Sequence, residues 1–264
     1  MRRIVKWQYR IVKLCSFVLF VCFFLHCSLL AAGDVLIVAD EIPAMDALAG
    51  KLKTEERIAA KVVTQTNMPS NLSAFSAVVV YVHMGLSEPA EKAFIAYTQE
   101  GGKLIVLHHS ISSMKRRNAE WFKFLGVSLP EGSLDQGGYK YTEGISMDIV
   151  NLAPDQFITT NKVAYPERIA FRAVDSSQEK MLPAVTLEDS EVYLNHVLIG
   201  PRTVLLGVKF TDAQSGNVYM QSHAGWVKPS GKGWIIYLMP GHSVRDLENP
   251  TYQRILLNAV IWKP

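Results

Sequence analysis

Residues 101–113 read GGKLIVLHHSISS, and this stretch decides the fold that we predict. Two glycines end a helical pattern, five mostly apolar residues follow, and the run passes directly into two histidines. A short apolar run bounded by turn residues is typical of a strand that is covered on both faces. Polar side chains directly after such a strand are typical of the ligand-binding edge of an open parallel sheet.

Similar apolar runs lie on both sides of this stretch. Before it, strand and helix patterns alternate at residues 34–40, 44–53, 61–66, 77–82 and 89–100. After it, further strand patterns and a last helix pattern lie at residues 202–210, 217–226, 234–239 and 250–262. This alternation predicts an α/β fold, a three-layer sandwich around a mainly parallel sheet. Residues 128–200 are richer in Gly, Pro, Asp and Ser, and they predict an irregular β-rich insertion within a single domain, residues 34–264.

Charge and cysteine content exclude several classes of function. The 264 residues have a net charge of +3, but residues 1–33 hold five basic and no acidic side chains, which leaves 22 basic against 24 acidic residues elsewhere. Such a balance argues against a nucleic-acid-binding protein. All three cysteines also lie in residues 1–33. The remaining chain therefore has no disulfide, no thiolate metal site and no cysteine nucleophile.

The first 33 residues have the pattern of an export signal. Residues 1–13 are basic, residues 14–32 are almost wholly apolar, and the run ends in Ala31-Ala32-Gly33. We expect a signal peptide cleaved before Asp34; the alternative is an uncleaved membrane anchor, because nineteen residues can span a bilayer. A lipoprotein is disfavoured because the bulky His26 precedes Cys27. Each alternative places the domain outside the cytosol, periplasmic or secreted, with membrane contact only through an uncleaved N-terminal segment.

Two segments resemble the trehalose-utilisation (ThuA-like) family. They are residues 101–126, from GGKLIVLHHSISS to Phe124-Leu125-Gly126, and residues 231–262, GKGWIIYLMPGHSVRDLENPTYQRILLNAVIW. Weaker similarities lie at residues 138–140, 155–159 and 190–193. The resemblance implies a flavodoxin-like fold of the class I glutamine amidotransferase type and a role in carbohydrate catabolism.

The sequence also departs from the family pattern. Tyr141, Gln156-Phe157 and Ser190 stand where the family has His, His-Pro and Asp, and Glu41-Ile42-Pro43 replaces a Gly/His-bearing loop. A divergent or partly inactive member is therefore an open alternative. Glutamine hydrolysis through a thioester is excluded, because residues 34–264 contain no cysteine.

Histidines at strand ends are the leading catalytic candidates. His108 and His109 follow one strand and His242 follows another, so all three share one sheet edge if the strands are parallel. An imidazole there can act as a general acid or base or can ligate a metal. Adjacent strand residues point to opposite faces, so both His108 and His109 reach one site only if the chain has already turned. For each histidine, the non-functional alternative is a side chain that packs against the fold or hydrogen-bonds the backbone.

Other candidates lie nearby or in the middle region. Glu191 is the fourth predicted catalytic residue, although SEVY (190–193) also reads as a plain alternating strand. We predict substrate contacts from Ser110, Tyr139, Tyr193 and Trp121. Lys115-Arg116-Arg117 predicts a solvated helix face. No metal-ligand spacing is present, so we predict no metal and no cofactor.

The resemblance implies a small-molecule carbohydrate as the partner. We expect an enzyme in which His108 or His109 abstracts a proton from a glycoside, disaccharide or keto-sugar while Glu191 or His242 assists the leaving group. Hydrolysis, elimination and isomerisation all remain open. The alternative is a non-catalytic saccharide- or protein-binding module of the cell envelope. A third, weaker alternative is an α/β domain that has lost its site.

Overall fold

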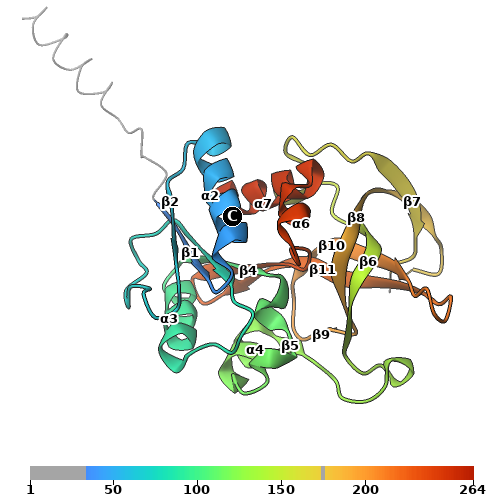
Figure 1. Cartoon of the computed structure of the whole chain (residues 1–264), viewed down its shortest axis with the longest axis horizontal. Helices are drawn as coiled ribbons and strands as arrows, with labels where there is room; N and C mark the ends of the chain where they lie inside the picture. The colour runs from blue at the N-terminus through green and yellow to red at the C-terminus, as the bar shows by residue number, and fades with distance from the viewer. Residues whose placement is uncertain (1–33, 174–175) are drawn as a thin grey trace, which may run out of the picture. The chain divides into compact units, whose positions relative to one another are not determined.

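A ten-stranded sheet organises residues 34–173 and 176–264, the parts of the chain that the computed structural model describes (Figure 1). The predicted signal peptide, residues 1–33, lies outside the described residues. The strand order is β2-β1-β3-β4-β12-β11-β10-β6-β8-β7. The described helices include none that is long and apolar enough to cross a membrane.

The first five strands in this order are parallel, as the alternation of strands and helices predicts. They are β2 (Ala60–Val63), β1 (Val35–Ala39), β3 (Ala77–Tyr81), β4 (Lys103–Leu107) and β12 (Gly233–Leu238). Every residue of β1 and β3 is buried. Both strands are continuously apolar because helices cover both faces of this half of the sheet.

The helices form a layer on each face of the parallel half (Figure 1). On one face lie α2 (Ile42–Lys51), which continues into a π-helical turn at Leu52–Glu56, α6 (Val244–Glu248) and α7 (Pro250–Ile261). On the other lie α3 (Glu88–Gln99) and α4 (Ala119–Leu125). A serine hydroxyl caps α3: Ser87 accepts from the backbone N–H of Ala90 and a proline follows the cap, which explains why the helix begins there.

The other five strands are antiparallel, so the sheet is mixed rather than mainly parallel. They are β11 (Val218–Ser230), β10 (Thr203–Thr211), β6 (Lys140–Asn151), β8 (Lys180–Leu194) and β7 (Glu167–Phe171). Residues 128–200 therefore extend the main sheet, and only β5 (Val127–Ser128) and β9 (Val197–Leu198) pair separately. The pairing of β6 with β8 shifts register around Ile145. This shift interrupts the alternation of polar and apolar residues by which a strand is recognised in a sequence.

The carboxyl ends of the parallel strands meet at one edge of the sheet. Four of them, β1, β3, β4 and β12, are neighbours in the order given above. Each is followed within four residues by a titratable side chain: Glu41, His83, the His108–His109 pair, and His242. The antiparallel strand β8 adds Glu191. The fold thus gathers these groups from distant parts of the sequence.

We predict that Gly233→Ala destabilises the protein by about 3 kcal/mol, because overpacking against backbone cannot be relieved by a rotamer change. An added Cβ at Gly233 would lie 2.2 Å from the carbonyl oxygen of Gly102 and 2.4 Å from that of Thr98. The matched control is Gly50→Ala in α2, where a Cβ meets no atom within 4 Å. That change should stabilise the helix by about 0.5–1 kcal/mol. Urea unfolding followed by circular dichroism measures both, and equal stabilities would contradict the packing described here.

Candidate functional site

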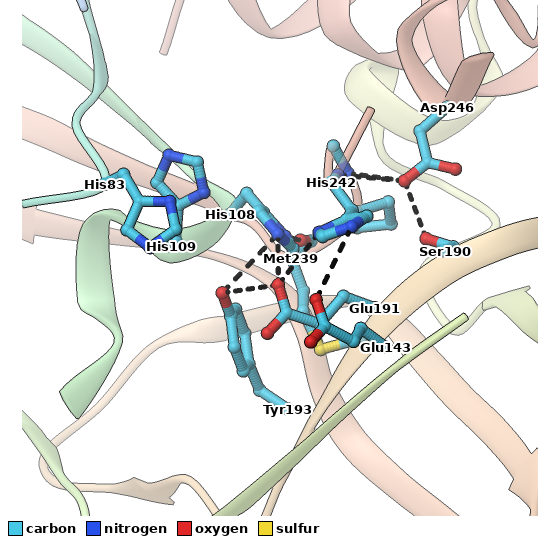
Figure 2. Close-up of polar contacts among 12 residues, drawn as sticks. His83, His108, His109, Glu143, Ser190, Glu191, Tyr193, Met239, His242 and Asp246 are labelled. Carbon is cyan, nitrogen blue, oxygen red and sulfur yellow. Dashed lines mark hydrogen bonds and ion pairs between the residues drawn. The ribbon is translucent and has the colours of Figure 1, made fainter. Parts of the chain in front are cut away.

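A cavity of about 260 Å³ opens at the carboxyl edge of the parallel strands. Its lining combines titratable and aromatic side chains: His83, His109, Tyr139, Tyr141, Glu143, Glu191, Tyr193 and His242, with Ser112, Ser113 and Met114. Figure 2 shows several of these side chains pointing toward one another. Of the eight predicted site residues, five line this cavity and a sixth, His108, lies directly behind it.

One carboxylate oxygen, Oε2 of Glu191, is the hub of the site (Figure 2). It accepts hydrogen bonds from His108 Nε2 at 2.8 Å, from His242 Nδ1 at 3.1 Å and from the Tyr193 hydroxyl at 3.1 Å. Burial alone would raise the pKa of Glu191, but the hydrogen bonds from His108 and His242 outweigh it and lower the pKa to about 2. Glu191 therefore remains an anion that fixes three surrounding side chains.

His108 supports this carboxylate from inside the protein. Its side chain is fully buried, and its Nδ1 donates to the Met239 carbonyl at 2.7 Å. A carbonyl and a carboxylate are both hydrogen-bond acceptors, so each ring nitrogen faces an acceptor. The ring is thus a fixed donor that positions Glu191.

A strained turn lets consecutive histidines serve one site. The backbone of His108 has φ = +46°, a left-handed conformation that non-glycine residues rarely adopt. It opens a 3₁₀ turn, His108–Ile111, and leaves the rings of His108 and His109 edge to face with centroids 4.9 Å apart. The chain has therefore turned before His109, which is the condition for both rings to approach one cavity.

His242 is held by a loop that Asp246 closes. Oδ2 of Asp246 accepts from the backbone N–H of Gly241 at 3.2 Å and of His242 at 2.9 Å, and from the Ser190 hydroxyl at 2.6 Å (Figure 2). Gly241 has φ = +130°, which only glycine adopts without strain. The hydrogen bond to Glu191 raises the pKa of His242, and the nearby carboxylates of Asp246 and Glu143 add to this effect.

His109 and Tyr139 also line the cavity. Burial, with the neighbouring charges of His108, Lys115 and His83, lowers the pKa of His109 to about 2, so the ring is neutral. Tyr139 stacks on His196 with ring centroids 5.4 Å apart, and burial raises the pKa of its hydroxyl. Both side chains are therefore uncharged.

Ser110 and Trp121 do not line the cavity, contrary to our expectation of substrate contacts. The Ser110 hydroxyl donates to the Val80 carbonyl at 2.9 Å and accepts from the Val82 N–H at 3.0 Å. Trp121 is fully buried, and its Nε1 donates to the Ser110 carbonyl at 2.9 Å. After the turn at His108, Ser110 points back into the fold, so both residues brace the turn.

Lys115 also differs from its predicted place on a solvated helix face. It is buried, and its ammonium group donates to the carbonyls of His83 and His109, the latter at 2.6 Å. Burial lowers its pKa to about 7. Its neighbours Arg116 and Arg117 are exposed, as expected. A run of three basic residues therefore gives no sign that the first of them is buried.

Sequence reasoning also missed His83, Glu143 and Asp246. His83 follows β3, so the strand-end rule that selected His108 and His242 applies to it equally. Asp246 lies in the quoted segment PGHSVRDL, four residues after His242. Glu143 pairs directly with Glu191 across β6 and β8, a register that the sequence does not reveal.

The family model described as trehalose utilisation, ThuA, matches residues 33–263. The chain belongs to the ThuA family. This result confirms the resemblance found in the sequence. Among curated proteins, none matches this chain.

Solved structures share the ThuA-like α/β fold. A ThuA-like protein from Bacteroides uniformis is 15% identical with a TM-score of 0.61, over 86% of this chain and 89% of that chain. A cytoplasmic protein from Salmonella typhimurium LT2 is 12% identical with a TM-score of 0.53, over 86% and 98%. A β-galactosidase from Bacillus circulans is 9% identical with a TM-score of 0.50, over 86% of this chain but 30% of the enzyme. At these identities the likeness concerns the fold alone.

We predict that His242→Gln changes the pH dependence of stability. Because the folded-state pKa of His242 is raised, its protonation stabilises the fold below about pH 6.5, the unfolded value, and this contribution disappears as the pH rises through the folded pKa. Wild type should therefore lose its advantage over the variant as the pH rises above about 6.5. Urea unfolding of both proteins across this range measures the difference. The groups facing His242 are Glu191, Glu143, Asp246 and His108, and a constant difference would show that they do not shift its titration.

Proposed function

We propose that this ThuA family member binds a sugar in the cavity and acts on it by acid–base chemistry, with His242 as the group that exchanges a proton with the substrate. The hydrogen-bonded unit of His108, Glu191 and His242 carries the proposal. A carboxylate that holds one nitrogen of an imidazole leaves the other nitrogen for a substrate, and the paired charge stabilises the protonated ring. His242 Nδ1 faces Glu191, which leaves its Nε2 for a substrate.

The placement of the histidines favours His242 over the other two for proton exchange. The side chain of His242 is 32% exposed, whereas that of His108 is 0% exposed. His109 lines the cavity, but its lowered pKa makes it a weak base. We therefore propose that His108 positions Glu191 and does not abstract the proton, the role that the sequence had suggested for it. His242 is the general base.

A keto-glycoside is the substrate class that suits this chemistry. His242 would take the proton from the carbon between the keto group and the anomeric carbon. The electron pair then forms a carbon–carbon double bond, and the glycosidic carbon–oxygen bond breaks. The leaving alcohol recovers a proton from the protonated His242. One base is sufficient for this elimination, whereas a standard glycosidase needs two positioned carboxylates.

The size and walls of the cavity support a sugar ligand. A volume of about 260 Å³ is just below the usual range for ligand pockets, so it suits one sugar ring. Tyr139, Tyr141 and Tyr193 supply aromatic walls. A second hollow of about 960 Å³ shares Ser113 and Met114 with this cavity, and it offers room for the remainder of a glycoside. The family's description as trehalose utilisation agrees with a carbohydrate.

We also propose that the parallel half is a scaffold of the flavodoxin-like, amidotransferase type. Its strand order, β2-β1-β3-β4-β12, follows the order 2-1-3-4-5 of such folds. The turn after β4 then corresponds to the position of the amidotransferase nucleophile. Here that turn carries imidazoles, which suits proton transfer rather than acyl transfer.

We predict that Glu191→Gln lowers turnover of a 3-keto-glycoside by about 10²–10⁴-fold, because the amide cannot act as the common anionic acceptor for His108 and His242. The matched control is Glu188→Gln, an exposed glutamate on the same strand, which should leave turnover unchanged. NMR of the products from a panel of glycosides and keto-glycosides measures the rates. Equal turnover by wild type and Glu191→Gln would remove this mechanism.

The same panel separates the enzyme from a binding module. Tyr141 is 55% exposed at the cavity, where an aromatic face suits sugar binding without catalysis. Calorimetric binding of a saccharide by wild type without any turnover would support the non-catalytic module. Phe157 is 40% exposed and does not line the cavity, so it does not fill the site as we would expect it to in an α/β domain that has lost its site.

We further propose export from the cytosol, on the basic and apolar pattern of residues 1–33. Mass spectrometry of the protein recovered from outside the cytosol should find Asp34 as its first residue. A chain that retains Met1 and sediments with membranes would instead indicate the uncleaved anchor.

A further inference from the structure

A second cluster of potential ligand side chains lies beside the cavity, which two of its members line. Glu41, His83 and His109 follow β1, β3 and β4, and one donor atom from each lies within 4.8 Å of the other two. Oε1 of Glu41 and Nδ1 of His83 are 3.2 Å apart, and the rings of His83 and His109 have centroids 4.6 Å apart. Figure 2 shows these two rings side by side. Neither Glu41 nor His83 has a part in the proposed proton transfer.

His109 carries a buried atom that the rest of the fold leaves without a partner. The residue is 3% exposed, and its Nε2 makes no hydrogen bond within the described part of the chain. An unpaired buried polar atom costs about 1–3 kcal/mol, so such atoms in native proteins need an explanation. A neutral imidazole in contact with a second imidazole and close to a carboxylate is the usual composition of a metal site.

The backbone around these side chains is held from several directions. Asp40 accepts from the N–H of His83 at 2.7 Å and from the N–H of Met84 at 2.9 Å. The buried ammonium group of Lys115 donates to the carbonyls of His83 and His109, which links the two loops. These hydrogen bonds fix the backbone from which His83 and His109 project.

We propose that Glu41, His83 and His109 bind a divalent transition-metal ion of the zinc class at the mouth of the cavity. Two imidazoles and one carboxylate form a ligand set for such ions, and three protein ligands leave coordination positions open. His83 and His109 line the cavity, so those positions face its interior. Glu41 and His83 also follow β1 and β3, between which the strand order reverses, where open parallel sheets bind ligands.

The ligand atoms of Glu41, His83 and His109 lie within 4.8 Å of one another, so they need to move only slightly closer together to bind one metal ion. An ion about 2.0–2.2 Å from each ligand, in tetrahedral geometry, places the ligand atoms about 3.4 Å apart. The pair of Glu41 and His83, at 3.2 Å, already meets this requirement. Their side chains are 44% and 53% exposed, so each can rotate toward His109 without disturbing the core.

The cluster of His108, Glu191 and His242 also offers three ligand atoms within 4.8 Å, but the nitrogens of both histidines that face Glu191 already bond its Oε2. Oε2 of Glu191 accepts three donors, and His108 uses its other nitrogen on Met239. A metal there would displace protons that now hold the three groups together. The unpartnered nitrogen of His109 therefore favours the cluster of Glu41, His83 and His109.

Metal binding by untagged protein, freed of metal with EDTA and dialysed, tests the proposal. Calorimetric titration with Zn²⁺ should give one site with a Kd of about 1 μM or tighter. Co²⁺ should give visible absorption bands typical of four- or five-coordination. His83→Ala and Glu41→Gln should each weaken Zn²⁺ binding by at least about 100-fold. Both substituted side chains are about half exposed, so circular dichroism should find these variants folded.

His242→Ala is the matched control, because it removes a ligand from the other cluster alone. It should bind Zn²⁺ as wild type does. Binding that is lost in His242→Ala and retained in His83→Ala would overturn the proposal in favour of the other cluster. Absence of a Zn²⁺ site in wild type would also overturn it. Because the readout is binding, these results stand apart from the turnover of Glu191→Gln, and either proposal can fail alone.

Discussion

The carboxylate of Glu191 joins the two halves of the sheet. It projects from the antiparallel strand β8 and accepts from His108, after the parallel strand β4, and from His242, after β12. An anion buried between donors is stable only while all of them remain in place, since removing one leaves charge without compensation. The position of Glu191 on β8, the turn at His108 and the loop closed by Asp246 are therefore constrained together. The shape of the cavity and the positions of its titratable side chains therefore depend on the same carboxylate.

Most of the parallel half could be predicted from the sequence. Runs such as VLIVA at β1 and AVVVY at β3 are buried on both faces, so composition alone identifies them. The strands of residues 128–200 could not be predicted as reliably. In β6 and β8, register shifts break the alternation of polar and apolar residues, and a 15-residue strand then reads as several short ones.

The candidate site was predictable where the strand-end rule could be applied. That rule led to His108, His109 and His242, and the family resemblance led to Glu191, Tyr139 and Tyr193. The rule did not place Ser110 because the chain reverses after His108, a turn that depends on tertiary packing, and Trp121, predicted as an aromatic sugar contact, instead packs under that turn. Asp246 and Lys115 were missed because their partners are mainly backbone atoms of other segments, which no local pattern encodes.

The left-handed backbone of His108 lowers the stability of the whole protein. A non-glycine residue in this conformation gives up about 1–3 kcal/mol of folding free energy. Glycine would relieve this torsion, but it would remove the ring that holds Glu191. Relief of the strain and retention of the hydrogen bond to Glu191 therefore oppose each other at one residue. We expect evolution toward thermal tolerance in this lineage to strengthen other regions and to keep the torsional strain at residue 108.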